Sequence, residues 1–303
     1  MIQNVIPKPL LKALRPYYHG ALSWFGASIY GFPSESLKVI GVTGTKGKSS
    51  VAYMTYRLLE NQGVKVGLSS SIYFSDGATL VKNDLRNSMP GRFRLHKLMR
   101  EAVDNGCEVF VMEVTSEGLA QNRHRGLHFV CAAITNLYPE HLEAHGGFEA
   151  YKEAKAELFQ ALVRKPEKHI SGHRLEKLTV VNADDEHSPY YRNIGLHDIL
   201  SVGIKNEADM EAKILTEDET GITFEITFQG TTCQGALPLM GSFNLTNAMI
   251  ALALGQWAGA SIKDMVATLG AISEIPGRMT VVHHNPRIIV DYAHIPVALE
   301  RVY

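Results

Sequence analysis

One stretch near the N-terminus constrains the fold more than any other, because an apolar run leads directly into a glycine-rich turn that a helix follows. Residues 39–42 have the composition of a buried strand, and residues 51–62 carry Val51, Met54 and Leu58 at helical spacing. Between them lie Gly44, Thr45, Lys46, Gly47, Lys48, Ser49 and Ser50. The order of strand, glycine-rich turn and helix predicts a phosphate-binding loop.

A turn of this kind directs successive backbone N–H groups and the positive end of a helix at an anion. Lys48 and the Ser49 hydroxyl are placed to reach a terminal phosphate and its magnesium ion. The general pattern G-x-x-x-x-G-K-[ST] is missed by one position, because Val42 occupies the place of the first glycine and Gly41 lies one residue earlier. A glycine-rich turn that binds nothing is the alternative, and the strand and helix on either side favour a nucleotide phosphate.

Composition narrows the function classes. The chain has 303 residues, 45% of them hydrophobic, so it can bury a sizeable core. Lys plus Arg number 30 and Asp plus Glu 31, so no excess of positive charge favours nucleic acid as a partner. No apolar run reaches the length of a transmembrane helix, and the three cysteines lack metal-ligand spacing. These features predict a cytoplasmic protein.

Residues 1–37 form a short amphipathic segment in which large apolar residues alternate with Lys8, Lys12, Arg15 and His19. Such a helix could lie on a membrane face, peripheral to the bilayer. Packing against its own domain is favoured because the basic residues are few. The segment is too short to be a domain.

From residue 39 onward, strand-like and helix-like runs alternate, which predicts βαβ units. The expected fold is α/β, with a mostly parallel P-loop NTPase-like sheet flanked by helices and ligands at the carboxyl ends of its strands. Residues 207–240 break the rhythm, since 222–228 alternate with period two, and predict a small antiparallel patch. We expect one ATP-binding domain over 38–276 and the start of another over 277–303.

Two candidate metal ligands follow predicted strands. Glu113 ends the apolar run 109–112, where a parallel sheet presents ligands, and could hold Mg²⁺ beside the phosphate loop. The alternative is a carboxylate that faces solvent at a strand end. His141 follows the strand predicted over 129–136, although a lone histidine is more often structural.

Lys155 is anomalous in the helix predicted over 148–163. At about 100° per residue, Phe148, Tyr151, Leu158, Phe159 and Leu162 fall within about 60° of it. Lys155 therefore lies in the middle of the apolar stripe, where an isolated ammonium group is disfavoured. It must extend its amine to water, lose its charge, pair with an acid or be modified, for example to a carbamate that can bind metal.

Weaker signals come later in the chain. Asn244 and Asn247 begin a helix and could contact a base edge, although helix capping also explains Asn244. Arg278 follows a Pro-Gly turn and could meet a phosphate or lie on the surface. Asp291 ends the strand predicted over 287–290. Asp184 and Asp185 could form a metal pair, but a turn rich in Asn and Asp is favoured.

Together these segments resemble the Mur ligase family, the ATP-dependent amide-forming enzymes of peptidoglycan precursor synthesis. The motifs that carry the resemblance are GVTGTKGKS at 41–49, EVTS at 113–116, NLYPEHLEAHG at 136–146, YKEAK at 151–155, GSFNLTN at 241–247, PGRM at 276–279 and DYAHIP at 291–296. The similarity runs from about residue 39 to 300, almost the whole chain. The phosphate loop of the family departs from the general pattern as this one does.

The resemblance implies the fold of the family's central domain and a set of site residues. Lys48 and Ser49 would handle the ATP phosphates and a first Mg²⁺, within the loop from Gly44 to Ser50. Glu113, His141 and a carbamylated Lys155 would complete the ligands of two Mg²⁺ ions. Asn247, with Asn244 nearby, would contact adenine, Arg278 the phosphates and Asp291 the ribose. The positions that match the family's contacts to the sugar-peptide substrate are Ser88, Met89, Thr115, Gln121 and Arg123.

The implied reaction adds an amino acid to UDP-N-acetylmuramoyl-dipeptide through an acyl phosphate. Ser49 and Glu140 are mild departures from the usual Thr and Asp, whereas Glu117 replaces a common histidine. Asn87, Ser88 and Met89 stand in place of a threonine pair, which leaves the peptide acceptor open. The family's UDP-binding and amino-acid-selecting domains have no counterpart here, so we expect residues 1–303 alone to form no amide.

Two other functions remain possible. A ligase of the same fold could extend a folate or a poly-amino acid, but Thr115, Gln121 and Arg123 favour the muramoyl substrate. A nucleotide-binding protein without ligase activity is disfavoured, because no Asn-Lys-x-Asp guanine signature is found and the predicted metal ligands are those of catalysis.

Overall fold

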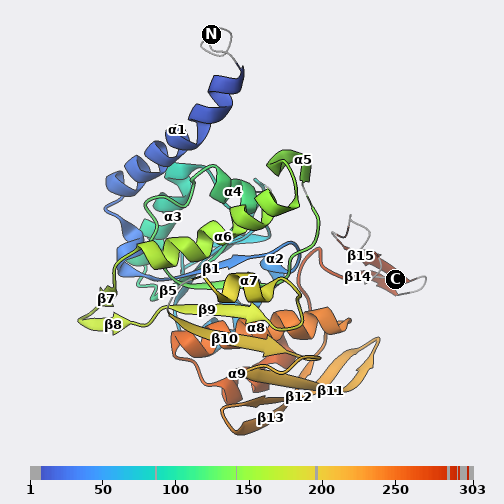
Figure 1. The fold of residues 1–303 in the computed structure, drawn as a ribbon. Coiled ribbons are helices and arrows are strands. Elements are labelled where there is room, and N and C mark those ends of the chain that lie inside the picture. Colours follow the sequence, from blue (N-terminus) through green and yellow to red (C-terminus); the bar gives the residue numbers. More distant parts are fainter. Residues whose placement is uncertain are drawn as a thin grey trace.

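A sheet of eleven strands lies at the centre of the molecule in the computed structural model, which describes residues 8–85, 87–140, 142–194, 197–284, 287–291, 293 and 299 (Figure 1). The strand order is β13-β12-β11-β10-β9-β6-β1-β5-β2-β3-β4. The bounds of the inner strands are β1 Lys38–Thr43, β2 Val66–Ser69, β5 Val109–Glu113, β6 Phe129–Ile134, β9 Leu178–Asn182 and β10 Asp198–Gly203. The outer strands are β3 Tyr73–Ser75, β4 Leu80–Lys82, β11 Met210–Asp218, β12 Gly221–Phe228 and β13 Thr231–Leu237.

The middle of this sheet is parallel, as the alternation of strands and helices predicted. Every neighbouring pair from β11 to β2 runs parallel, and the antiparallel pairs lie toward the two edges. All residues of β5, β6 and β9 are buried, because helices cover both faces of the sheet. The fold class predicted from the sequence is therefore confirmed.

Two helical layers divide the core. Ile40 and Val42 of β1 pack in one cluster with α2 (Lys48–Asn61), α8 (Ser242–Ala258) and α9 (Ile262–Thr268). Val39 packs in the other cluster, which contains residues of α3 (Arg92–Asp104), α4 (Ser116–Ala120), α6 (Phe148–Arg164) and α7 (Ser188–Arg192). Neighbouring residues of a strand point to opposite faces, so these clusters lie on the two sides of the sheet.

The sequence correctly predicted an antiparallel patch, but it did not predict where this patch lies in the fold. β11, β12 and β13 form two antiparallel pairs within 210–237 and extend the main sheet through β10. β10, β3 and β4 were not predicted, nor were α7 and the pair β7 (Lys168–Ile170) and β8 (His173–Leu175). A separate antiparallel pair consists of β14 (Thr280–His284) and β15 (Arg287–Val290), and β15 coincides with the predicted strand.

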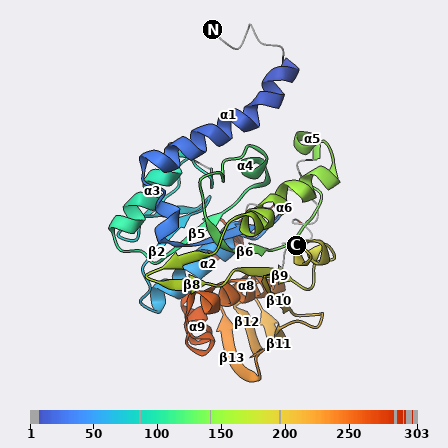
Figure 2. The same ribbon diagram turned by 60° about the vertical axis from the view of Figure 1, so that its left-hand side comes forward.

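The N-terminal segment forms α1 (Lys8–Ile29) and a 3-10 turn, η2 (Pro33–Ser36). α1 contacts α3 and runs beyond the end of the domain in both views (Figures 1 and 2). The Ser23 hydroxyl lies 2.8 Å and 2.7 Å from the carbonyl oxygens of Arg123 and Arg125. His128 and Glu35 join η2 to the domain at 2.7 Å. None of the helices in the described parts of the chain has the length and apolar character needed to cross a bilayer.

His96 on α3 makes the attachment of α1 sensitive to pH. Its side chain is fully buried, and its Nε2 atom lies 3.4 Å from the Ser23 hydroxyl. Its Nδ1 atom has no hydrogen-bond partner within the described residues. Burial lowers the pKa of His96 from 6.5 to about 4. The folded state therefore takes up this proton less readily than the unfolded state, and stability is lost as pH falls from 6.5 toward 4.

We expect the free energy of unfolding to fall by about 2 kcal/mol between pH 7 and pH 5 through this histidine alone. The measurement is urea unfolding at both pH values for the wild type and His96→Gln, which should lose correspondingly less. His169→Gln is the matched control, since His169 is exposed. Equal pH dependence in the wild type and His96→Gln would contradict the assignment.

Candidate active site

The residues predicted to bind the nucleotide and its metal, apart from His141, gather at one edge of the sheet, where β1, β5, β6 and β9 end. This edge borders a cavity of about 560 Å³. Its lining includes Lys46, Gly47, Ser50, Asn136, Asn182, Asp184, Asn244, Asn247, Arg278 and Asp291. The carboxyl ends of parallel strands meet at the same edge, so residues far apart in the chain converge here.

The loop between β1 and α2 depends on two glycines. Gly44 has φ 143°, and a Cβ atom there would lie 1.9 Å from the Thr135 hydroxyl. Gly47 has φ 86°, and its Cβ would lie 2.4 Å from Oδ1 of Asn247. Both positions exclude a side chain on conformational and steric grounds. Gly47 therefore allows the loop to approach α8 closely.

Gly41 has a different role, which explains why it is out of register with the general pattern. It lies within β1, where a Cβ would meet Leu158 of α6 at 2.8 Å and the Phe129 ring at 3.0 Å. Gly41 therefore allows β1 to pack beneath α6. It takes no part in the turn itself.

Hydrogen bonds fix the rest of the loop. The Thr45 hydroxyl lies 3.1 Å from the Tyr151 hydroxyl and accepts from the Tyr138 N–H at 2.9 Å. The Lys46 N–H donates to Oδ1 of Asn136 at 2.9 Å, and its ammonium group pairs with Glu140 at 2.8 Å. Residues that follow β6 therefore hold the loop that follows β1.

Ser49 is at the centre of a polar cluster next to this loop. Its hydroxyl donates to Oε2 of Glu113 at 3.0 Å and lies 2.8 Å from the Ser71 hydroxyl. The Ser71 N–H donates to the same Glu113 oxygen at 2.9 Å, and Nη2 of Arg278 donates to the Ser49 hydroxyl at 3.2 Å. Glu113 is only 4% exposed, so it does not face solvent as the alternative supposed.

Lys48 and Lys155 converge on the same backbone oxygen. The Lys48 ammonium donates to the carbonyl oxygens of Gly44 and Thr45 at 3.0 Å and 2.8 Å. Lys155, 1% exposed, donates to the Gly44 oxygen at 2.8 Å and lies 4.3 Å from the centre of the Tyr151 ring. Burial lowers the pKa of Lys48, and burial together with the charge of Lys48 holds the pKa of Lys155 well below its usual value. The shift is toward the neutral amine.

The predicted nucleotide contacts line the other side of the cavity. Asn247 lies against Gly47, and the Asn244 amide donates to the Met240 carbonyl at 2.8 Å. Gly241 is the residue that caps the N-terminus of α8. Asn244 therefore lies inside the first turn of this helix and is not its N-cap residue. Asp291 accepts from the N–H groups of Met279 and Ala293.

Comparison with known proteins identifies the family. The profile of the Mur ligase middle domain matches residues 42–255. The chain belongs to the Mur ligase family.

Named relatives agree with this assignment. The chain is 34% identical over 284 residues to a UDP-N-acetylmuramoyl-L-alanyl-D-glutamate--2,6-diaminopimelate ligase of Bacillus velezensis, covering 93% of this chain and 56% of the relative. It is 35% identical over 288 residues to a UDP-N-acetylmuramyl-tripeptide synthetase of Borreliella afzelii, covering 93% and 55%. The chain spans about half the length of the curated relatives it matches.

Solved structures share the fold. A structure of a UDP-N-acetylmuramoyl-L-alanyl-D-glutamate--2,6-diaminopimelate ligase has a TM-score of 0.69 and 28% identity, covering 88% of this chain and 53% of that one. MurF from Acinetobacter baumannii has a TM-score of 0.73 at 21% identity, covering 93% and 56%. The second likeness shows the fold alone.

The substrate positions of this Mur ligase domain form a second group around Arg123. Its guanidinium donates to the Met89 carbonyl at 3.0 Å and to Oε1 of Gln121 at 3.1 Å. The Thr115 hydroxyl accepts from the Gly118 N–H at 3.1 Å and so caps α4. Met89 and Ser88 are 0% and 3% exposed. The structure therefore brings the predicted positions together, and their contact with substrate stays a prediction.

Other predicted residues have different outcomes. His141 lies outside the described residues.

Asp184 accepts from the N–H groups of Ile204, Lys205 and Asn206, and Asp185 accepts from those of Leu137 and His187. The bond from His187 to Asp185 is that of a local turn, as favoured from the sequence, whereas Asp184 holds the distant loop that follows β10. Across the described residues, no three His, Cys, Asp or Glu side chains group in a way that could hold a metal ion.

Ser71 is a site residue that the sequence analysis missed. It follows β2, a parallel strand that ends at Ser69, and so belongs to the same edge as the loop and Glu113. The run of three serines that begins with the last residue of this strand was the available signal. Serine is common in turns, so these residues gave no specific signal. The sequence also does not show that β2 lies beside β5, which is what brings Ser71 to Glu113.

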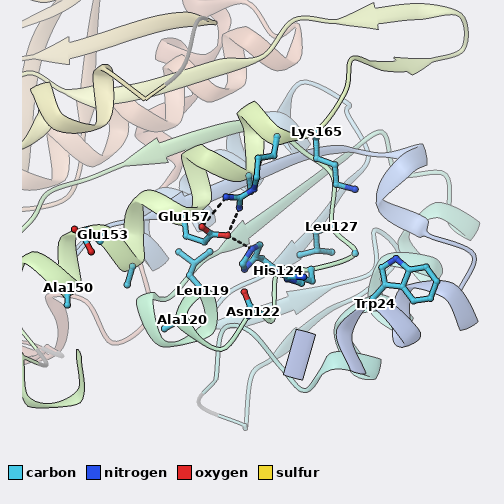
Figure 3. Close-up of a pocket in the computed structure, with 15 residues that line it drawn as sticks. Trp24, Leu119, Ala120, Asn122, His124, Leu127, Ala150, Glu153, Glu157 and Lys165 are labelled. Carbon is cyan, nitrogen blue, oxygen red and sulfur yellow. Dashed lines mark hydrogen bonds and ion pairs between the residues drawn. The ribbon is translucent and has the colours of Figure 1, made fainter. Parts of the chain in front are cut away.

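A second and larger cavity lies away from this chemistry. It has a volume of about 820 Å³ and lies between α6, the segment after α4 and α1 (Figure 3). Glu157 bridges His124, at 3.0 Å, and Arg164 across one wall. None of the predicted site residues lines it.

Proposed function

We propose that this chain is the ATP-binding core of a ligase that adds an amino acid to UDP-N-acetylmuramoyl-dipeptide, in the cytoplasm, during peptidoglycan precursor synthesis. The observation that carries the proposal is the convergence of Lys48, Ser49, Glu113 and Arg278 around the phosphate loop. Two cationic side chains, one hydroxyl and one carboxylate at a helix N-terminus suit a nucleotide triphosphate with its metal. Family membership and the names of the relatives support the same reaction.

The oxygen donors beside the loop fit Mg²⁺. Ser49 Oγ and Glu113 Oε2 lie 3.0 Å apart, and Ser71 Oγ lies 2.8 Å from Ser49. A hard cation that takes oxygen ligands suits this group. When bound, Mg²⁺ would neutralise charge on the phosphate oxygens. Ser49 and Glu113 would hold it, and the Ser71 N–H would orient the carboxylate.

Adenosine would occupy the 560 Å³ cavity. Asn247 and Asn244 lie on α8 at one side of it, where Asn247 would meet the adenine edge. Asp291 and Arg278 come from the segment after α9, where they would meet the ribose and the phosphates. Arg278 already reaches the Ser49 hydroxyl, so it contributes directly to the phosphate end of the site.

The reaction would proceed in two steps. A carboxylate oxygen of the substrate attacks the γ-phosphorus of ATP, so that an acyl phosphate forms and ADP leaves. The amino group of the incoming amino acid then attacks the acyl carbon, and inorganic phosphate leaves as the amide forms and the amine loses a proton. Negative charge develops on the transferring phosphoryl oxygens, and Lys48, Arg278 and the loop N–H groups would stabilise it.

Lys155 would act as a carbamate in this scheme. Its lowered pKa increases the share of the neutral amine, which is the form that adds CO₂ and releases a proton when the carbamate forms. The product is a carboxylate-like group beside the loop, able to bind a second Mg²⁺ with His141. This would also remove one of the two positive charges at the Gly44 oxygen.

The acceptor would bind along the group formed by Thr115, Gln121 and Arg123. Arg123 is oriented by Met89 and Gln121, and a guanidinium group suits a carboxylate or phosphate of a sugar-peptide substrate. The muramoyl peptides named for the relatives carry such groups.

The nucleotide assignment predicts that Glu113→Gln weakens binding of Mg-ATP to this chain by about tenfold or more, because a carboxylate ligand becomes a neutral amide. Isothermal titration calorimetry with and without Mg²⁺ measures the effect. Glu108→Gln is the matched control, since Glu108 is exposed just before the other end of β5. Equal Mg²⁺-dependent affinity in both variants would contradict the role of Glu113.

The acceptor assignment predicts that the chain binds UDP-N-acetylmuramoyl-dipeptide and that Arg123→Ala weakens this binding by about tenfold or more, because a charge-assisted contact is lost. Saturation-transfer NMR and calorimetry with this ligand and with a folate measure the preference. Binding of the folate in place of the muramoyl peptide would overturn the assignment, as would no binding of the muramoyl peptide.

The carbamate predicts a new carbonyl resonance in the ¹³C NMR spectrum after addition of ¹³C-bicarbonate. The resonance should be absent from Lys155→Met and present in Lys152→Met, a control one turn away on α6 whose ammonium pairs with Glu149. Loss of the resonance from both variants, or from neither, would show that the carbamate is not on Lys155.

A further inference from the structure

Among the side chains of α1 that the structure describes, from residue 17 onward, five large ones are exposed whereas four small residues are buried. The exposed fractions are 73% for Tyr17, 61% for Tyr18, 57% for Trp24, 54% for Phe25 and 55% for Ile29. Gly20, Ser23, Gly26 and Ala27 are buried on the opposite side. This is the reverse of the usual arrangement for a helix that packs on a globular domain.

The close packing of the small face prevents the helix from rotating to bury these aromatic residues. A Cβ on Gly20 would lie 3.0 Å from Cδ of Arg125, and a Cβ on Gly126 would lie 2.7 Å from the Ala27 methyl group. The Ser23 hydroxyl is fixed by the carbonyl oxygens of Arg123 and Arg125. This interface has no room for larger side chains. The side of α1 that carries the aromatic residues therefore faces away from the domain.

The exposed residues form one stripe. At about 100° per residue, Tyr17, Tyr18, Trp24, Phe25 and Ile29 fall within an arc of about 140°. Trp24 and Phe25 make edge-on ring contacts with Phe32 and Phe93, and both stay more than half exposed. Tyr and Trp are the residues that favour the boundary between lipid headgroups and acyl chains. A stripe of this kind is typical of a helix that lies in a membrane interface.

The charge of this segment selects the kind of surface. Residues 1–34 contain Lys8, Lys12 and Arg15 and no Asp or Glu. The whole chain has 30 basic and 31 acidic residues, so residues 35–303 carry four more acids than bases. A basic segment on an acidic protein is attracted to an anionic lipid surface. A second copy of the same face would bring like charges together.

We propose that α1 binds the surface of an anionic lipid bilayer through this aromatic stripe and holds the domain against it. The helix lies along the surface, since it is not one that could cross a membrane. Both views show it extending beyond the domain, where a flat surface can reach it (Figures 1 and 2). Trp24 also lines the larger cavity, together with Arg125, Arg164, Lys165, Glu153 and Glu157, so basic and acidic side chains both lie near the stripe. The proposal is independent of the proposed ligase activity.

Vesicle co-sedimentation tests it. We expect the chain to bind vesicles of phosphatidylglycerol mixed with phosphatidylcholine, to bind pure phosphatidylcholine much less, and to be released by added salt. Trp24→Ser combined with Phe25→Ser should weaken binding by about tenfold or more, because two apolar anchors are lost. The matched control is Val81→Ser combined with Leu215→Ser, two exposed apolar residues on β4 and β11.

Fluorescence gives a second readout at the stripe itself. The chain has two tryptophans, so Trp257→Phe leaves Trp24 as the only one. Its emission should move to shorter wavelength when anionic vesicles are added and should be quenched by brominated lipid. No emission change, equal binding to both vesicle types, or equal binding by the two double variants would overturn the proposal. So would a dimer in solution that Trp24→Ser with Phe25→Ser abolishes, because a second copy would then cover the stripe.

Discussion

The carbonyl oxygen of Gly44 accepts hydrogen bonds from two lysines, the partly buried Lys48 and the fully buried Lys155, and much of the site depends on this arrangement. Lys48 and Lys155 lie 3.0 Å and 2.8 Å from it, so their nitrogens are at most about 6 Å apart. Two full charges at that distance repel by about 3 kcal/mol at an effective dielectric constant of 20. Burial further disfavours both charges, and the pKa of each group is lowered. The arrangement is relieved when one lysine is neutral or carries a negative group, and Lys155 is the more strongly shifted.

Gly44 can occupy this position only because the strands on both sides hold the loop. Its missing side chain leaves room for the Thr135 hydroxyl, which follows β6. Glu113 from β5 and Ser71 from the segment after β2 then meet Ser49 on the other side. Four consecutive neighbours in a parallel sheet, β6, β1, β5 and β2, therefore build one continuous polar surface at their carboxyl ends. The large apolar area buried under α2, α8 and α6 stabilises the sheet that holds these groups in register.

α1 follows a different rule from the rest of the fold. The other long helices bury their large apolar residues against the sheet, whereas α1 attaches through glycine, serine and alanine and leaves five large side chains exposed. Its attachment includes the fully buried His96, whose low pKa links this contact to pH. The segment is therefore fixed to the domain on one side and available to a second surface on the other.

The sequence by itself determined the α/β class, the inner strands other than β10, the glycine-rich loop between β1 and α2 and the anomaly of Lys155, because these follow from local patterns of apolar residues and from short motifs. It also placed Glu113 and Asp291 at strand ends. Only the tertiary structure decided that the 210–237 patch extends the main sheet, that Gly41 serves packing, and that Ser71 joins the site, since each depends on which strands are neighbours. The outward face of α1 was decided in the same way. Periodicity shows that a helix has an apolar stripe, and only the close approach of Gly20 and Ala27 to the domain decides which face is buried.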